Sequence, residues 1–255
     1  MRVISLQSGS NGNCVYVEAG EAALLFDAGI SGSQARQRLA RHGIDIHRAA
    51  AVLVSHDHAD HSRAAGIYQR KFGLPIYATA ATFRVASARY RLGEVEDLRC
   101  FHAGATLRFG KVRVETIPTP HDGVDGVAFV IDDGRRRFGI LTDLGHVFGD
   151  LDAILRSLDA VLLESNYDPK MLEQSHYPDL LKQRIRGPHG HLANAEAAEL
   201  LLGSATRRLQ WACLGHLSQE NNHPTVALAT HRKILGPQFP LRVATRYEAS
   251  DVMEL

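Results

Sequence analysis

Cysteine is scarce in this sequence of 255 residues: Cys14, Cys100 and Cys213 lie far apart and form no C-x-x-C pair. This scarcity argues against both a disulfide framework and a zinc site built from thiolates. An excess of one charge is lacking too, because 29 Lys and Arg residues face 28 Asp and Glu residues. The net charge therefore gives no overall electrostatic attraction to a polyanion, and a nucleic acid must be bound by local contacts.

Long apolar runs are also missing. None reaches the length of about 20 residues that a membrane-spanning helix needs, and residues Met1 to Ser5 begin a strand-like pattern instead of an export signal. We therefore expect a cytoplasmic protein with no membrane partner, and the sequence identifies no protein partner. Histidine is what the chain has in excess, with 14 residues, several of them beside acidic residues. This enrichment points toward metal binding.

Alternating strand-like and helix-like segments predict a single α/β domain over residues 1–255, with stacked sheets and helices outside. We expect glycine C-caps at Gly43 and Gly73, an N-cap at Asn194, and hairpin turns at Gly110-Lys111 and Asp133-Gly134. The expected strands are Cys14 to Val17, Ala22 to Phe26, Ala51 to Ser55, Pro75 to Thr79, Thr106 to Ile117 and Val127 to Leu141 as hairpins, Asp159 to Glu164, Leu209 to Leu214, and Leu241 to Thr245. The expected helices are Gln34 to His42, Arg63 to Phe72, Asp179 to Arg186, Asn194 to Leu202, and one that begins near Pro224.

The segment from Ser55 to His61 carries the pattern H-x-H-x-D-H directly after an expected strand. If the segment is extended, His56, His58 and Asp60 face one side and His61 the other, an arrangement that suits two metal ions. Imidazole and carboxylate ligands without thiolate favour Zn or Mn, with Fe as an alternative. A chance cluster of surface histidines is the competing interpretation, and the density of the pattern argues against it.

This motif resembles the signature of the metallo-β-lactamase fold, an αββα sandwich of two mixed sheets with helices on the outer faces. The resemblance implies further ligands at His121, Asp143 and His216, each at the end of an expected strand. It implies that Asp143 is shared by the two ions. It assigns the remaining ligands to one ion through His56, His58 and His121, and to the other through Asp60, His61 and His216, with Asp60 also catalytic. Asp27 matches an acidic residue that supports the ligand loop by hydrogen bonds, although a turn-forming role explains it nearly as well.

Two later segments favour phosphodiester cleavage. Glu164 and His191 match a carboxylate and histidine pair of the tRNA 3′-processing nucleases, in which the histidine is thought to protonate the leaving oxygen. A carboxylate that holds an imidazole raises its pKa and fixes its orientation, as a general acid requires. Two ions about 3.5–4 Å apart can generate a hydroxide at neutral pH and clamp both oxygens of a phosphoryl displacement. For His191 alone, a structural role at the start of a helix is the alternative.

Taken over almost the whole chain, the motifs are similar to the YycJ/WalJ-type branch of this superfamily, regarded as 5′→3′ exonucleases acting on DNA, with RNA as an alternative substrate. The resemblance rests on Gly9 to Asn13, the ligand motif, Thr142 to Gly145, Glu164 to Asp168, Gly190 to Leu192 and His216 to Asn222. The chain is too short between Asp143 and Glu164 for the cap domain of the β-CASP nucleases, and it lacks the arm with which tRNase Z grips tRNA. The residues expected to support the site or to offer donors to a phosphate are Ser10, Asn11, Asn13, Asn221 and Asn222, although turn formation alone explains them as well.

The leading hypothesis is therefore a two-metal exonuclease that acts on DNA ends through an activated hydroxide. A small-molecule phosphodiesterase or a glyoxalase-like thioesterase of the same fold remains open, as does a catalytically silent metal-binding module. Fold alone does not separate these functions, because function depends on the remainder of the site.

Overall fold

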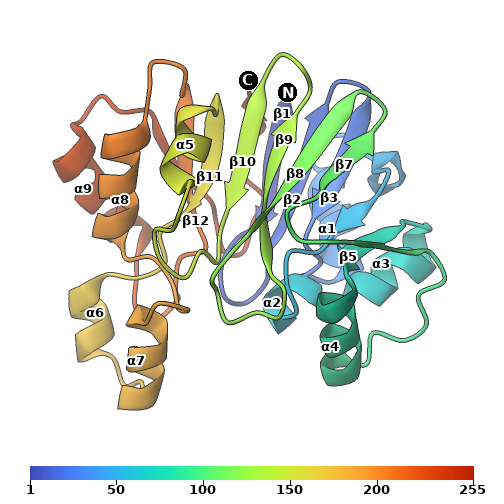
Figure 1. Ribbon diagram of the computed structural model, residues 1–255, viewed down its shortest axis with the longest axis horizontal. Coiled ribbons are helices and arrows are strands. Elements are labelled where there is room, and N and C mark those ends of the chain that lie inside the picture. The colour runs from blue at the N-terminus through green and yellow to red at the C-terminus, as the bar shows by residue number, and fades with distance from the viewer.

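Two seven-stranded sheets stack face to face in the computed structural model, which describes residues 1–255, and helices cover their outer faces (Figure 1). The first sheet has the order β14-β1-β2-β3-β4-β5-β6 and the second the order β13-β12-β11-β10-β9-β8-β7. Both are mixed, as the fold assignment predicted. The strands of the first sheet are β1 (Arg2–Gln7), β2 (Cys14–Ala19), β3 (Ala22–Phe26), β4 (Val52–Leu53), β5 (Ile76–Thr79), β6 (Leu98–Phe101) and β14 (Met253–Glu254). Those of the second are β7 (Thr106–Phe109), β8 (Val112–Pro118), β9 (Val127–Asp132), β10 (Arg137–Leu141), β11 (Ala160–Glu164), β12 (Trp211–Gly215) and β13 (Leu241–Val243).

The two sheets are built by the same scheme. In each, the strands that come first in the chain pair antiparallel, from β1 to β3 and from β7 to β10. The later strands then pair parallel, from β3 to β6 and from β10 to β13. Because parallel strands share a direction, their carboxyl ends meet at the same edge of the sheet.

Helices flank each sheet and connect its parallel strands. On the first sheet lie α1 (Gly32–Ala40), the short 3-10 helix η1 (Ile46–Arg48), α2 (Ala59–Ser62), α3 (Ala65–Phe72) and α4 (Ala80–Tyr90). The second sheet is followed by α5 (Leu151–Arg156), α6 (Pro169–Gln174), α7 (Asp179–Arg186), α8 (Asn194–Ser204) and α9 (Pro224–Leu235). In Figure 1, α6 and α7 lie below the sandwich on the side of α8, and α4 lies below it on the opposite side. No helix is both long and apolar enough to cross a bilayer.

Three apolar layers hold this arrangement. The central layer lies between the sheets, where the rings of Phe26 and Phe129 from facing strands pack with centroids 5.1 Å apart. A second layer packs α1 and α3 on the first sheet, and a third packs α5 and α8 on the second. Burial of apolar area is the main favourable term in folding, so the two sheets are held together chiefly by the central layer.

Most predicted elements form, with some corrections at their ends. The hairpin turns at Gly110 and Gly134 are present, and Gly73 ends α3 in the left-handed conformation. Gly43 was wrong as a helix cap, because α1 ends at Ala40 and Arg41 is its C-cap. The missed elements are β6, α4, α6, β14 and the short helices η1 and α2. In α4 only Thr82 and Ala86 are buried, so the helix shows no clear apolar stripe.

Asn194 is not the N-cap of α8, as the sequence had predicted. Ala193 occupies that position, and Asn194 is the first residue of the helix. The reason is that the Asn194 side chain is engaged elsewhere: its Oδ1 accepts a hydrogen bond from the hydroxyl of Ser165 at 2.6 Å, and its Nδ2 donates to Oδ1 of Asn222 at 3.0 Å. The amide therefore joins two loops at the edge of the second sheet.

Candidate metal centre

The predicted ligands and their supporting residue Asp27 gather at the edge of the sandwich where strands of both sheets end. Asp27 follows β3, His56 follows β4, His121 follows β8, Asp143 follows β10 and His216 follows β12. Helix α2, which carries the predicted ligands Asp60 and His61, lies at the lower centre of Figure 1, below the strand ends. Both halves of the chain thus contribute to one site.

Three of these residues have a backbone conformation that is uncommon outside glycine. Asp27, Asp143 and His216 have φ angles of +65°, +55° and +53°. Each is the residue at which a strand gives way to a loop, and such strain in a folded protein tends to be concentrated at functional sites. At these three strand ends the backbone is therefore in a locally unfavourable conformation, which sets the position of the side chain.

The ligand motif itself is not fully extended, which corrects one prediction. His58 is the N-cap of α2, and Asp60 and His61 lie on that helix. The hydroxyl of Ser62 donates to the carbonyl oxygens of Asp57 and His58, which holds the turn closed. Alternation along a strand therefore does not decide which way these side chains point.

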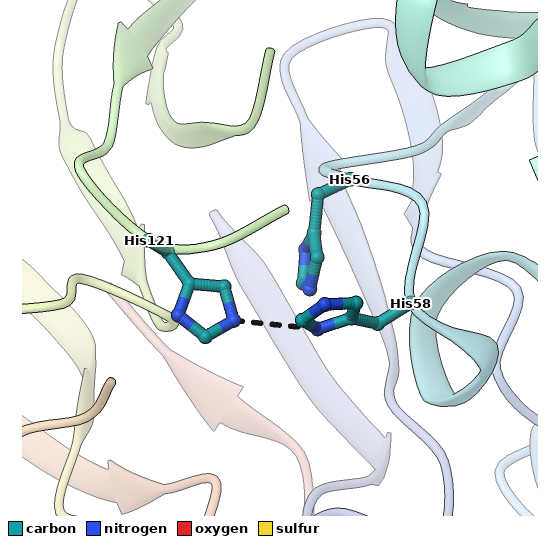
Figure 2. Close-up of side chains that lie close together, drawn as sticks. All are labelled: His56, His58 and His121. Carbon is teal, nitrogen blue, oxygen red and sulfur yellow. Dashed lines mark hydrogen bonds between the residues drawn. The ribbon is translucent and has the colours of Figure 1, made fainter. Parts of the chain in front are cut away.

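His56, His58 and His121 form the first group of candidate ligands (Figure 2). Nε2 of His121 lies 3.3 Å from Nδ1 of His58, and Nδ1 of His121 donates to the carbonyl of Gly190 at 2.8 Å. A second hydrogen bond of this kind fixes the tautomer and orientation of a metal-binding imidazole. Burial and the neighbouring rings of His61 and His58 keep the pKa of His56 well below its usual value. The ring is therefore neutral, as ligation requires.

Asp60, His61 and His216 form the second group. Oδ2 of Asp60 lies 3.4 Å from Nε2 of His61 and 3.3 Å from Nε2 of His216. Burial disfavours a charged imidazole, but the carboxylates of Asp143 and Asp60 outweigh it and raise the pKa of His216 to about 10. The carboxylates of Asp143, Asp27 and Asp60 likewise outweigh burial and raise the pKa of His61 well above its usual value. The second group thus holds an excess of negative charge that only bound cations or protons neutralise.

Asp143 lies between the two groups. Its Oδ2 is 3.3 Å from Nε2 of His61, and its Oδ1 is 3.7 Å from Nε2 of His121 and 3.5 Å from Nδ1 of His216. Oδ2 of Asp143 and Nε2 of His56 are buried and have no hydrogen-bond partner. A buried polar atom without a partner is costly unless something binds it. These two atoms, in a set of nitrogen and oxygen donors, fit a divalent cation.

Asp27 supports the second group without reaching its metal-facing atoms. Its Oδ2 accepts from Nδ1 of His61 at 2.8 Å, and its Oδ1 accepts from the backbone N–H of Ser55 at 2.8 Å. The expected hydrogen bonds to the ligand loop are therefore present. Gly29 allows the loop to approach, because a Cβ there would stand 1.6 Å from the carbonyl oxygen of Asp60.

We expect Asp27→Ala to lower metal affinity by about 10–100-fold, the usual effect of removing a carboxylate that orients a metal-binding histidine. His61 would lose the hydrogen bond that fixes its ring. Titration of metal-free protein with Zn or Mn, followed by calorimetry, measures the change. Asp45→Ala is the matched control, since Asp45 is an exposed carboxylate that also accepts from a histidine, His47. An affinity equal to that of the control would contradict the role given to Asp27.

Glu164 and His191 meet as the sequence predicted. Nδ1 of His191 donates to Oε1 of Glu164 at 2.6 Å, and Oε2 of Glu164 accepts from the backbone N–H of Leu144 at 3.0 Å. Glu164 is fully buried, and although burial alone would raise its pKa, attraction to His191 and His216 holds that pKa well below its ordinary value. The carboxylate is therefore a fixed negative partner for the imidazole, and it leaves Nε2 of His191 available to the cleft.

A cleft of about 200 Å³ opens over this cluster, with Ser10, Asp60, Asp143, His191 and His216 among its lining residues. Asn13 also lies at the centre, because its Nδ2 donates to Oδ2 of Asp60 at 3.2 Å and is 2.9 Å from Nε2 of His61. Ser10 therefore lines the cleft, whereas the amide of Asn13 is engaged by the ligand residues themselves.

The other expected phosphate donors are engaged within the protein. Oδ1 of Asn11 accepts from Nη1 of Arg246 at 3.0 Å. Nδ2 of Asn221 donates to the hydroxyl of Ser218 at 3.1 Å, and Nδ2 of Asn222 donates to the carbonyl oxygen of Ser165 at 2.8 Å. Asn221 and Asn222 are both buried. Through these contacts the three asparagines hold their loops in place, and none of the three lines the cleft.

Three contributors were missed in the sequence. Nδ2 of Asn166 donates to the carbonyl oxygen of His216 at 2.8 Å, and the hydroxyl of Ser8 accepts from the backbone N–H of His216 at 2.8 Å. Oδ1 of Asp122 lies 3.3 Å from Nε2 of His58, and its Oδ2 accepts from Nε of Arg184 at 2.5 Å. Asp122 directly follows a predicted ligand, which was the available signal. Nothing in the spacing of the sequence pairs it with Arg184.

Comparison with known proteins places these features in context. Residues 23–211 match the family described as the beta-lactamase superfamily domain. The chain is 35% identical over 227 residues to "Exodeoxyribonuclease WalJ" of Streptococcus pneumoniae, covering 88% of this chain and 84% of that protein. It is 31% identical over 232 residues to "Exodeoxyribonuclease YycJ" of Bacillus anthracis, covering 90% and 87%.

Solved structures with the same fold include the metallo-β-lactamase fold protein YhfI of Bacillus subtilis, with a TM-score of 0.72 and 16% identity over 98% of this chain and 99% of that one. The short form of human tRNase Z has a TM-score of 0.67 and 16% identity, and each chain is covered completely. At these identities the likeness concerns the fold alone.

Proposed function

The chain belongs to the beta-lactamase superfamily and is a hydrolase, and from that premise we propose that it is an exodeoxyribonuclease, a two-metal phosphodiesterase that removes nucleotides from DNA ends. One observation carries the proposal: the buried carboxylate of Glu164 holds the partly exposed imidazole of His191 beside a cluster of nitrogen and oxygen donors. The identity with the two exodeoxyribonucleases over most of both chains supports DNA as the substrate.

The residues proposed to hold two divalent ions are those of the two groups described above. His56, His58 and His121 would bind one ion, and Asp60, His61 and His216 the other, with Asp143 shared. Their chemistry suits Zn or Mn, with Fe as an alternative. When bound, two such ions supply the positive charge that activates a water molecule and stabilises the phosphate in the transition state.

We assign to His191 the role of the group that donates a proton in the reaction. Glu164 accepts from Nδ1 of this ring at 2.6 Å, so the ring is held in one orientation with Nε2 toward the cleft. The proton at Nε2 then passes to the oxygen that leaves the phosphate, which is the role of a general acid. Asn13 donates toward the same region and orients the carboxylate of Asp60.

The proposal includes several finer points. Cleavage runs 5′→3′, DNA is preferred to RNA, the protein works in the cytoplasm, and residues 1–255 act as a single domain without a cap domain or arm. Only one helix, α5, lies between β10 and β11, where larger nucleases of this superfamily carry their cap.

A time course on end-labelled DNA tests the function. Linear single and double strands, labelled at the 5′ or the 3′ end, are incubated with the protein and Mn, Zn or Fe in turn. We expect immediate release of a labelled mononucleotide from the 5′ end, a shortening ladder with the 3′ label, and no cleavage of covalently closed circles. Turnover of a generic phosphodiester with all DNA left intact would instead indicate a small-molecule phosphodiesterase.

A further inference from the structure

A second cavity adjoins the metal cleft on the side of β12 and α9. Its volume is about 650 Å³, against about 200 Å³ for the cleft itself. Ser218 lines both. Ser8 also lines the cavity, and its hydroxyl accepts from the backbone N–H of His216. The loop that carries a candidate metal ligand is therefore the wall between the two spaces.

Arg246 connects this loop to the loop that contains Asn11. Its Nη1 donates to Oδ1 of Asn11 in the loop that precedes Asn13, and its Nη2 donates to the carbonyl oxygen of Leu217. Its guanidinium group also lies against Gly9, since a Cβ there would stand 3.0 Å from it. These contacts fix the shape of the cavity relative to the metal centre.

The lining of the cavity is mostly apolar and nearly neutral. Leu217, Pro224 and Val243 contribute apolar surface, and Arg246 and Glu248 are the charged residues, of opposite sign. A phosphate gains little from such a surface. Tyr247 lines the same cavity and is 63% exposed, which is unusual for a large ring, and its hydroxyl lies 3.5 Å from Oε1 of Gln219.

We propose that this cavity binds a nucleobase of the DNA strand next to the phosphate that is cleaved, with the base stacked on Tyr247 and its edge near Gln219 and His223. The inference rests on the proposed nuclease function. The metal cleft is below the size of about 300–1,000 Å³ that is usual for ligand pockets, whereas the cavity lies within it. The cleft thus has room for the phosphate, and the attached base needs a neighbouring site.

A base is favoured over other occupants by three properties of the cavity. It adjoins the cleft at Ser218, which lines both spaces, so it lies close to any group covalently joined to a phosphate in the cleft. It offers an aromatic ring, and every base has a flat face that stacks on such rings irrespective of sequence. Its amide and imidazole rim, from Gln219 and His223, matches the polar edge of a base.

The test combines Tyr247→Ala with single-stranded DNA in which one base at a time, counted from the 5′ end, is replaced by an abasic residue. We expect Tyr247→Ala to raise KM on intact DNA about tenfold, the effect of losing one stacked base. At one abasic position the wild-type protein should show the same rise, and there the variant should show no further change. Tyr247→Phe, which keeps the ring, should restore KM to near the wild-type value.

Leu202→Ala is the control, because Leu202 is an exposed apolar residue on α8 that lines neither space. If wild-type protein degrades DNA but Tyr247→Ala behaves like this control, the base site is overturned and the nuclease function stands. The base site is also overturned if the variant and the abasic position have additive effects. If wild-type protein fails to cleave any DNA, the proposed function falls, and the base site with it.

Discussion

Asp143→Asn is expected to remove nearly all activity, by about 10³-fold or more, and to lower the occupancy of both metal positions. Asparagine keeps the shape of the side chain but loses its charge and one of the two oxygens that face opposite groups of ligands. Metal ions contribute several kcal/mol of transition-state stabilisation, and each 1.36 kcal/mol corresponds to about a tenfold change in rate. Activity and metal content per chain, measured on the same purified sample, check both parts of this expectation.

The matched control for this change is Asp150→Asn. Asp150 is exposed and precedes α5, and its side chain makes no capping hydrogen bond. The same loss of charge there should leave metal content and activity at the wild-type level. Two ions still bound per chain in Asp143→Asn, at wild-type affinity, would mean that Asp143 does not bridge the two groups.

His191→Ala is expected to have the second large effect while keeping both ions. His191 donates to Glu164 and is assigned to neither of the two groups of ligands proposed above. Loss of a general acid slows a reaction by about 10²–10⁴-fold, so kcat on DNA should fall by that factor with metal content unchanged. The loss should be smaller for an aryl phosphodiester, since a phenolate leaves readily without a proton.

His102→Ala provides the control for His191, because His102 is an exposed histidine on the loop after β6. Comparison of kcat on DNA and on the aryl ester separates a proton donor from a structural residue, which would depress both rates equally. Metal loss in His191→Ala equal to that in Asp143→Asn would contradict the separate roles given to these two residues.

The local part of the site could be predicted from the sequence, and its assembly largely could not. His56 to His61 are neighbours in the chain, so their proximity follows from spacing alone. His121, Asp143 and His216 come together only because β8, β10 and β12 run in the same direction and end at one edge of the second sheet, and resemblance supplied that step. The helical turn at Ala59–Ser62 was missed because its capping contacts, such as the hydroxyl of Ser62 on the carbonyl of His58, are invisible in a hydropathy pattern.

Contacts between distant segments explain the remaining differences. Asn194 is of a residue type that often caps helices, yet its side chain hydrogen-bonds instead to Ser165 and Asn222, which are 29 and 28 positions away in the chain. The cavity beside the metal centre is formed by residues near Ser8, Ser218 and Tyr247, which no local motif connects. Such sites depend on the tertiary fold, and single-sequence patterns carry information only about nearby positions.

The shared scheme of the two sheets has a thermodynamic consequence. His56, His58, Asp60 and His61 come from the half of the chain that forms the first sheet, whereas His121, Asp143 and His216 come from the half that forms the second. In the proposed holoprotein each ion is a cross-link between the two halves, and neither half alone offers a complete ligand set. A ligand that binds only the native state raises the free energy of unfolding as its concentration rises. The stability of the two-sheet fold, as well as its activity, would then depend on the concentration of the metal ion.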